Sequence, residues 1–121
     1  ARALMIADHF ARNPKDNPML VTIMALFNQF KDIFTVNYLR WLSRRKGEPF
    51  PSDMELMRIL RKNNTFAINE IKQTSANWDN RKVFQILGLL REYDAKSKGL
   101  NTGGATDGEL LRELLLKIFL L

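Results

Sequence analysis

The sequence predicts an all-α fold, a compact bundle of about five to six helices. Apolar side chains recur at the three- and four-residue spacing of amphipathic helices along most of the chain. No stretch alternates with the period of two that a half-buried strand requires. The length of 121 residues and the hydrophobic share of 45% are typical of one globular domain, over residues 1–121.

The N-terminal part of the chain is predicted to form a short helix and then a long one. Apolar spacing predicts a helix over 2–13, which Pro14 stops. Asn17 and Pro18 are a typical N-cap and first helical residue, and they open a helix that reaches about Ser43. Because the first half of this helix is apolar nearly all round, we interpret it as a central core helix.

Two shorter helices are predicted next. Ser52 and Asp53 can cap a helix over 54–60. A turn at Asn63 and Asn64 then separates it from a helix over 65–77.

A further helix is predicted over 80–98, with Asp79 as its N-cap. Gly88 lies in its middle, where close packing can offset the propensity cost of glycine. Gly99 is a natural residue to follow the end of a helix.

The last helix has the clearest start signal. Thr106 and Glu109 have the spacing of a capping box, in which each side chain binds the backbone N–H of the other residue. Leu110, Leu111 and Leu114 then form an apolar stripe.

Residues for metal and nucleophilic chemistry are scarce. Without cysteine the chain has no disulfide, thiolate metal site or cysteine nucleophile, and its single histidine, His9, is interpreted as a half-buried side chain or a weak pH-sensitive contact. No glycine precedes Lys-Ser or Lys-Thr, as a P-loop requires. Glu92 and Asp94 diverge on a helix, and Glu109 and Glu113 share a solvent-facing side. The sequence therefore predicts no catalytic residue, no metal and no cofactor.

The chain is basic, with a formal charge of +6 and a pI near 9.9, which suggests an acidic partner. A solvated helical face and a site for DNA or another acidic partner both explain the densest group of basic residues. Trp41 and Trp78 are interpreted as core or interface packing, with stacking on bases as the alternative. The basic group consists of Arg40, Arg44, Arg45, Lys46, Arg61 and Lys62.

No membrane span or export signal is expected. The longest apolar stretch, residues 19–27, is interrupted by Thr22 and is far shorter than the roughly 20 residues that cross a bilayer. We therefore expect a cytoplasmic protein that does not bind a membrane. Because the chain begins without Met, we also expect a fragment of a longer one.

The most distinctive element is a pair of segments near the C-terminus. Residues 91–99 read Arg-Glu-Tyr-Asp-Ala-Lys-Ser-Lys-Gly, and residues 107–114 read Asp-Gly-Glu-Leu-Leu-Arg-Glu-Leu. On physical grounds these segments are a well-made helix pair, in which Asp94 and Lys98 lie four residues apart and can form an ion pair.

This pair resembles the C-terminal helical domain, or collar domain, of the delta subunit of the bacterial DNA polymerase III clamp loader. In that family a helix ends in a pattern like that of 91–99, a loop of small residues follows, and a pattern like that of 107–114 opens the final helix. The Asn-Pro-rich segment 13–18 is similar to a break in that family. Leu60, Asn63 and Phe66 match a Leu-Gly-Val-Asn-Pro-x-Phe turn of that family, in which Arg61, Lys62 and Asn64 replace the Gly, Val and Pro.

The resemblance implies a collar domain of a longer subunit, whose AAA+-like modules lie upstream. It implies no catalysis by this domain, and membership of the DNA polymerase III holoenzyme, a DNA-directed DNA polymerase and thus a nucleotidyltransferase. The implied partners are the other clamp-loader subunits in a five-membered ring, primed DNA indirectly or weakly, and the sliding clamp through the upstream modules.

The resemblance also marks residues for helix packing or for the subunit interface. The sequence does not separate core from interface among them, nor for Phe119. An alternative function is a stand-alone basic helical domain that binds nucleic acid through phosphate contacts. A small helical enzyme, with Glu92, Asp94 and His9 in one pocket, is the third hypothesis. The marked residues are Leu90, Arg91, Tyr93, Asp94, Lys98, Gly99, Asp107, Leu110, Leu111 and Leu114.

Overall fold

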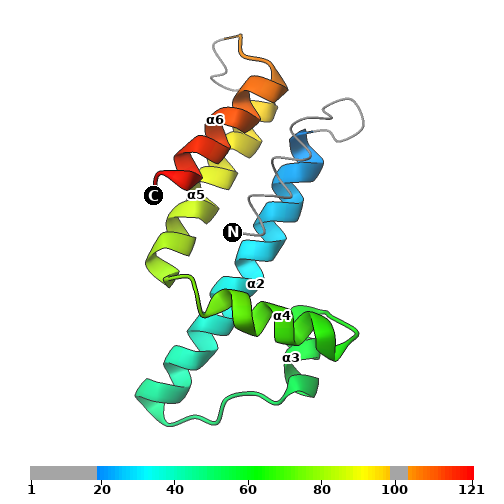
Figure 1. Ribbon diagram of the computed structural model, residues 1–121, viewed down its shortest axis with the longest axis vertical. Helices are drawn as coiled ribbons and strands as arrows, with labels where there is room; N and C mark the ends of the chain where they lie inside the picture. Colours follow the sequence, from blue (N-terminus) through cyan, green and yellow to red (C-terminus); the bar gives the residue numbers. More distant parts are fainter. Residues whose placement is uncertain (1–18, 99–103) are drawn as a thin grey trace. The chain divides into compact units, whose positions relative to one another are not determined.

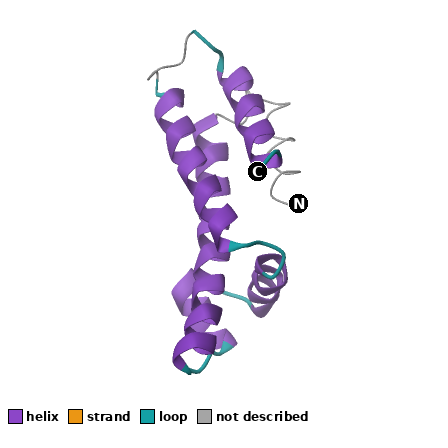
Figure 2. Cartoon of the chain, turned by 90° about the vertical axis from the view of Figure 1, so that its left-hand side faces the viewer, coloured by secondary structure: helices purple, strands orange, loops and turns teal. Residues whose placement is uncertain are grey.

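The computed structural model describes residues 19–98 and 104–121, and within them it confirms the all-α fold. These residues contain helices and connecting loops and no strand (Figures 1 and 2). The predicted helix over 2–13, His9 and Gly99 lie outside the described residues. The helices are α2 (Met19–Lys46), α3 (Asp53–Leu60), α4 (Thr65–Ser75), α5 (Asn80–Ser97) and α6 (Asp107–Phe119).

The described chain divides into two units. Residues 30–84 form the middle unit, which holds α3 and α4 with the C-terminal part of α2 and the first turn of α5. The terminal unit consists of residues 19–29, 85–98 and 104–121. The single domain expected over 1–121 stays a prediction.

A small apolar core holds the middle unit together. Four side chains from α2, α3 and α4 are buried against one another, and four partly buried ones surround them. Burying one such aliphatic side chain contributes about 1.5–3 kcal/mol. The buried residues are Val36, Leu56, Leu60 and Ile68, and the surrounding ones are Leu39, Phe50, Met57 and Ile71.

Local side-chain and backbone signals set the ends of α3 and α4. The Ser52 hydroxyl accepts the N–H of Glu55 at 3.2 Å and begins α3. Arg61 ends α3 in the left-handed conformation, with φ of 57°. The Asn64 side chain accepts the N–H of Ala67 at 2.7 Å and begins α4. The predicted cap at Ser52 and the predicted turn before α4 are therefore confirmed, and Asn64 of that turn is also the N-cap of α4.

The long helix α2 ends three residues later than expected. Gly47, with φ of 67°, takes a left-handed conformation immediately after Lys46. Arg44, Arg45 and Lys46 lie in the last turn, where positive charge is favoured by the dipole of the helix.

Helix α2 is the one described helix that is long and apolar enough to cross a membrane by length and composition. Its most apolar window has a mean hydropathy of 1.3, and 44% of that window is buried inside the protein. The apolar character of α2 thus extends beyond the stretch 19–27 on which the expectation of no membrane span was based. Core helices meet the same criterion, and α2 buries Ile23, Leu26 and Phe30 as a core helix does.

The terminal unit contains the α5–α6 pair, and its distinctive leucines are core residues. Leu90, Leu110, Leu111 and Leu114 are buried, as is Tyr93. Helix α6 begins with the predicted capping box. The Thr106 hydroxyl accepts the N–H of Glu109 at 3.2 Å, and the Glu109 carboxylate accepts the N–H of Thr106 at 3.4 Å.

The prediction that Gly88 packs closely against another element is wrong. Gly88 lies on an exposed side of α5, and a Cβ atom added there would meet none of the described residues within 4 Å. A glycine at this position therefore weakens the helix by about 1 kcal/mol relative to alanine without a packing gain.

Candidate functional site

The middle unit has an open hollow of about 730 Å³ between the last turns of α2 and the connection from α4 to α5. One wall comes from α2 and carries two aromatic rings and two arginines. The other comes from residues 75–80. The lining residues are Asn37, Tyr38, Arg40, Trp41, Arg44, Ser75, Ala76, Trp78, Asp79 and Asn80.

Two asparagine side chains fasten the α4–α5 connection to α2. Asn37 donates from Nδ2 to the carbonyl oxygen of Trp78 at 2.9 Å, and Asn80 donates from Nδ2 to the carbonyl oxygen of Phe34 at 3.1 Å. The Trp78 ring meets Phe30 edge to face, with centroids 5.1 Å apart. The interpretation of Trp78 as a packing residue is therefore confirmed. These contacts hold the second wall of the hollow in place.

Asn80 also carries an unusual atom. Its Oδ1 is enclosed and has no hydrogen-bond partner among the described residues. A buried acceptor left without a partner costs about 1–3 kcal/mol. This wall of the hollow therefore holds an acceptor that the described residues do not satisfy.

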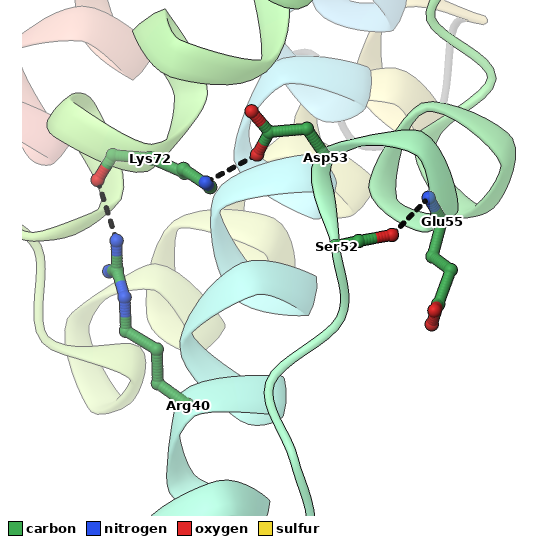
Figure 3. A network of polar contacts seen from close by, with 5 residues as sticks. All are labelled: Arg40, Ser52, Asp53, Glu55 and Lys72. Atoms are coloured by element: carbon green, nitrogen blue, oxygen red, sulfur yellow. Dashed lines mark hydrogen bonds and ion pairs between the residues drawn. The ribbon is translucent and has the colours of Figure 1, made fainter.

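Arg40 lies across the end of α4. Its guanidinium donates to Asn37 Oδ1 at 3.2 Å and to Ser75 Oγ at 2.8 Å. It also donates to the carbonyl oxygen of Lys72 at 2.8 Å (Figure 3). A cation suits this place because the last carbonyl groups of a helix are unpaired and partly negative. Burial lowers the pKa of Arg40, and the neighbouring charge of Arg44 lowers it further.

A second ion pair lies beside this contact. Lys72 Nζ binds the carboxylate of Asp53, which joins α4 to the first turn of α3 (Figure 3). Because both Arg40 and Asp53 hold Lys72, one through its carbonyl and the other through its side chain, α2, α3 and α4 are linked at a single residue.

The other aromatic pair of the hollow is open to solvent. Tyr38 and Trp41 lie one helical turn apart on α2 and stack with ring centroids 6.0 Å apart and an interplanar angle of 18°. They remain 47% and 48% exposed. Trp41 is therefore no core residue, which leaves an interface or ligand role for it. Arg44 follows Trp41 by one turn and is exposed.

The structure divides the predicted basic patch. Arg44, Arg45 and Lys46 are exposed together at the end of α2. Arg40 is engaged internally, as above, and Lys62 forms an ion pair with Asp32 at 3.4 Å. Arg61 is exposed at the end of α3.

Asp32 itself is nearly buried, at 7% exposed. Its burial raises the pKa of the carboxyl group, an effect that the charge of Lys62 and the hydrogen bond to it oppose. Lys62 therefore serves to compensate a buried carboxylate rather than to bind a partner.

The terminal unit places the motif residues around one buried ring. Tyr93 Oη donates to Glu113 Oε1 at 2.6 Å. Lys96 Nζ and Lys117 Nζ lie 4.6 Å and 5.1 Å from the centroid of the Tyr93 ring. The predicted pair of Asp94 and Lys98 is present at 3.2 Å. Lys96 follows Tyr93 by three residues on α5, whereas Glu113 and Lys117 belong to α6, so local spacing did not predict the hydrogen bond or the second cation.

The remaining motif positions have other roles. Arg91 and Asp107 are exposed, and Asp107 lies in the first turn of α6, where a negative charge is favourable.

A second groove of about 420 Å³ lies within the terminal unit between α2 and α5. Its lining is mostly apolar and includes three charged side chains. The lining residues are Leu20, Ile23, Met24, Phe27, Asn28, Leu90, Arg91, Asp94 and Lys98.

Three of the four carboxylates considered for catalysis pair with lysines, and the fourth, Glu109, is bound to Thr106 in the capping box. Glu92 Oε2 lies 3.6 Å from Lys96 Nζ and 3.9 Å from Lys117 Nζ. Among residues 19–98 and 104–121, no group of three His, Cys, Asp or Glu side chains is placed to hold a metal ion.

Comparison with known proteins gives no relative. No family model, no curated protein and no solved structure matches this chain.

Proposed function

We propose that this chain is a structural oligomerisation domain, the collar of a delta subunit in the DNA polymerase III clamp loader. In this function it holds its subunit in the five-membered ring that places the sliding clamp on primed DNA in the cytoplasm. The domain itself is not catalytic, and its partners are the other clamp-loader subunits. The sliding clamp is reached through modules upstream of this domain.

One observation supports an oligomerisation function above all. Helix α6 has apolar residues on two opposite sides, and only one side is buried. Leu116 and Phe119 lie on the open side, and Leu120 continues it just beyond the helix. Leu110, Leu114 and their neighbours already provide the side that faces the core.

An open apolar helix face of this kind gains free energy when a neighbouring subunit covers it. Full burial of each large side chain contributes about 1.5–3 kcal/mol before the cost of association is subtracted. Charged residues at the rim then select the neighbour and its orientation. The arrangement therefore suits a domain whose work is to pack against others.

The experiment measures complex formation by size-exclusion chromatography with light scattering. The chain is run alone and with the remaining clamp-loader subunits, at low and at high salt. We expect a complex that persists at high salt, because apolar burial is not screened by ions. Absence of any complex would contradict the proposal.

A matched pair of variants locates the surface. Phe119→Asp and Phe66→Asp each place a carboxylate at a highly exposed phenylalanine, 75% and 73% exposed, in α6 and α4. We expect Phe119→Asp to weaken the complex at least about tenfold and Phe66→Asp to leave it unchanged. Equal effects of the two variants would show that the open face of α6 is not the contact.

Nucleic-acid binding is a second candidate function, and a specific observation favours it. Arg44, Arg45 and Lys46 are exposed as a continuous group, next to the exposed rings of Tyr38 and Trp41. Binding that falls steeply with salt would support this function and would not occur in purely apolar docking.

A further inference from the structure

We propose that the hollow of the middle unit binds single-stranded nucleic acid, with a base stacked against the Tyr38–Trp41 pair and a neighbouring phosphate held by Arg44. This inference specifies the second candidate function and is independent of the collar function. Packing by α6 and strand binding by the hollow use different residues, so either one can fail alone.

The aromatic pair supplies the surface for a base. The two rings are nearly parallel, and their centroids lie 6.0 Å apart, so each ring is offset from its partner and covers it only in part. About half of each residue remains open to solvent. Stacking on such rings is the common way in which proteins bind unpaired bases, since every base has a flat face.

Positive charge without a local partner supplies the site for a phosphate. Within the described part of the chain, Arg44, Arg45 and Lys46 have no ion pair. The guanidinium of Arg40 binds neutral oxygens only, so its charge is not cancelled by a carboxylate. The charge of four basic residues therefore acts on one end of α2. Burial lowers the pKa of Arg40, and the charge of Arg44 lowers it further.

The size and shape of the hollow favour a strand over other occupants. At about 730 Å³ it is within the range of small-ligand pockets, so it can hold a nucleotide, and its open form leaves room for the chain to continue. A duplex offers no free base face for the rings. A proline-rich peptide also docks on aromatic rings, but its proline residues carry no negative charge that would pair with a group of cations.

The test measures fluorescence anisotropy of labelled dodecamers with the 121-residue chain. The probes are oligodeoxyadenylate, oligoriboadenylate and a DNA hairpin, at about 50 mM and about 200 mM NaCl. We expect both single strands to bind more tightly than the hairpin and to compete with each other. The ratio of the two single-strand affinities then distinguishes DNA from RNA as the source.

Variants test each part of the site. We expect Trp41→Ala to weaken single-strand binding about tenfold or more, and Trp41→Phe to weaken it less, because a ring is kept. Phe84→Ala is the matched control, since Phe84 is an exposed aromatic residue of the same unit, 69% exposed, that does not line the hollow. We expect Phe84→Ala to bind within about twofold of the original chain.

Arg44→Gln tests the phosphate contact and leaves both aromatic rings in place. We expect it to lower the slope of log affinity against log salt by about one. The control is Arg58→Gln, at an exposed arginine of α3 that does not line the hollow, and we expect it to leave the slope unchanged. Circular dichroism verifies that each variant is folded. If Trp41→Ala does not fold, Arg44→Gln and Trp41→Phe decide the outcome.

Three results would overturn the proposal. One is that no single strand binds at about 50 mM salt. Another is that Trp41→Ala and Phe84→Ala have the same effect, which would mean that binding is electrostatic without stacking. The third is that a proline-rich peptide occupies the site while oligonucleotides do not.

Discussion

Tyr93 of α5 donates a hydrogen bond of 2.6 Å to Glu113 of α6, and this contact joins the two segments that carry the distinctive sequence pattern. The ring of Tyr93 is buried, so its hydroxyl reaches the carboxylate from inside the helix pair. Lys117 lies against the ring and within 3.5 Å of the same carboxylate oxygen. The aromatic ring, the acid and the base thus form one unit.

The Tyr93 hydroxyl should contribute measurably to stability. We expect Tyr93→Phe to lower the free energy of unfolding by about 1 kcal/mol, because the ring still fills its place and only the hydrogen bond is lost. Urea denaturation measures the change. If Tyr93→Phe were as stable as the original chain, the hydrogen bond would have no net value.

The same contact should make stability depend on pH on the acid side. The hydrogen bond from Tyr93 lowers the pKa of Glu113, and the charge of Lys117 acts in the same direction. A carboxylate whose pKa is lower in the folded state stabilises the fold above its unfolded pKa, and this contribution is lost as the pH falls through the folded pKa.

The variant Glu113→Gln tests this pH dependence. We expect it to be less stable than the original chain at neutral pH, and the difference to disappear in acid, where the original carboxyl is protonated too. Thermal unfolding at a series of pH values measures it. A difference that stays constant from neutral pH into acid would contradict the assignment to Glu113.

Arg40 should act as a structural cation at the end of α4. We expect Arg40→Met to destabilise the protein by about 1–2 kcal/mol, because the Ser75 hydroxyl and the Lys72 carbonyl lose a charged donor. Arg45→Met is the control, since Arg45 is an exposed arginine five residues further along the same helix. Equal destabilisation by the two substitutions would refute this function of Arg40.

Leu90 and Leu116 should respond differently to the same change. Leu90 is fully buried, so Leu90→Asp should cost several kcal/mol and unfold the chain. Leu116 is on the open side of α6, so Leu116→Asp should leave the fold intact and affect only association. Circular dichroism of the isolated chain distinguishes them, and a folded Leu90→Asp variant would mean that Leu90 is not a core residue.

For the candidate site, sequence reasoning named only part of what the structure brings together. Arg40, Arg44 and Trp41 were recognised because they are close in sequence and share a helix. Tyr38 had no signal beyond its helical spacing from Trp41. The opposite wall at 75–80 lies more than 30 residues away, and no short-range pattern connects it to α2.

The sequence by itself determined the local structure. The starts of α3, α4 and α6 follow from side chains that reach a backbone N–H three residues away, and the Asp94 and Lys98 pair follows from one helical turn. Each of these contacts involves residues only three or four positions apart, so it does not depend on how the rest of the chain packs. The end of α2 was less predictable, because it depends on the single left-handed residue Gly47.

Tertiary structure alone decided which charges are free and which apolar residues are buried. In the sequence, Lys62 and Arg40 resemble the other basic residues. In the structure, Lys62 pairs with a carboxylate that is distant in sequence. Arg40 binds three oxygen atoms, of which only that of Asn37 is close in sequence. Leu90 and Leu116 are chemically identical, yet one is core and the other is surface. The physical reason is that burial and ion pairing depend on which helices meet, and that is settled by the packing of the whole chain.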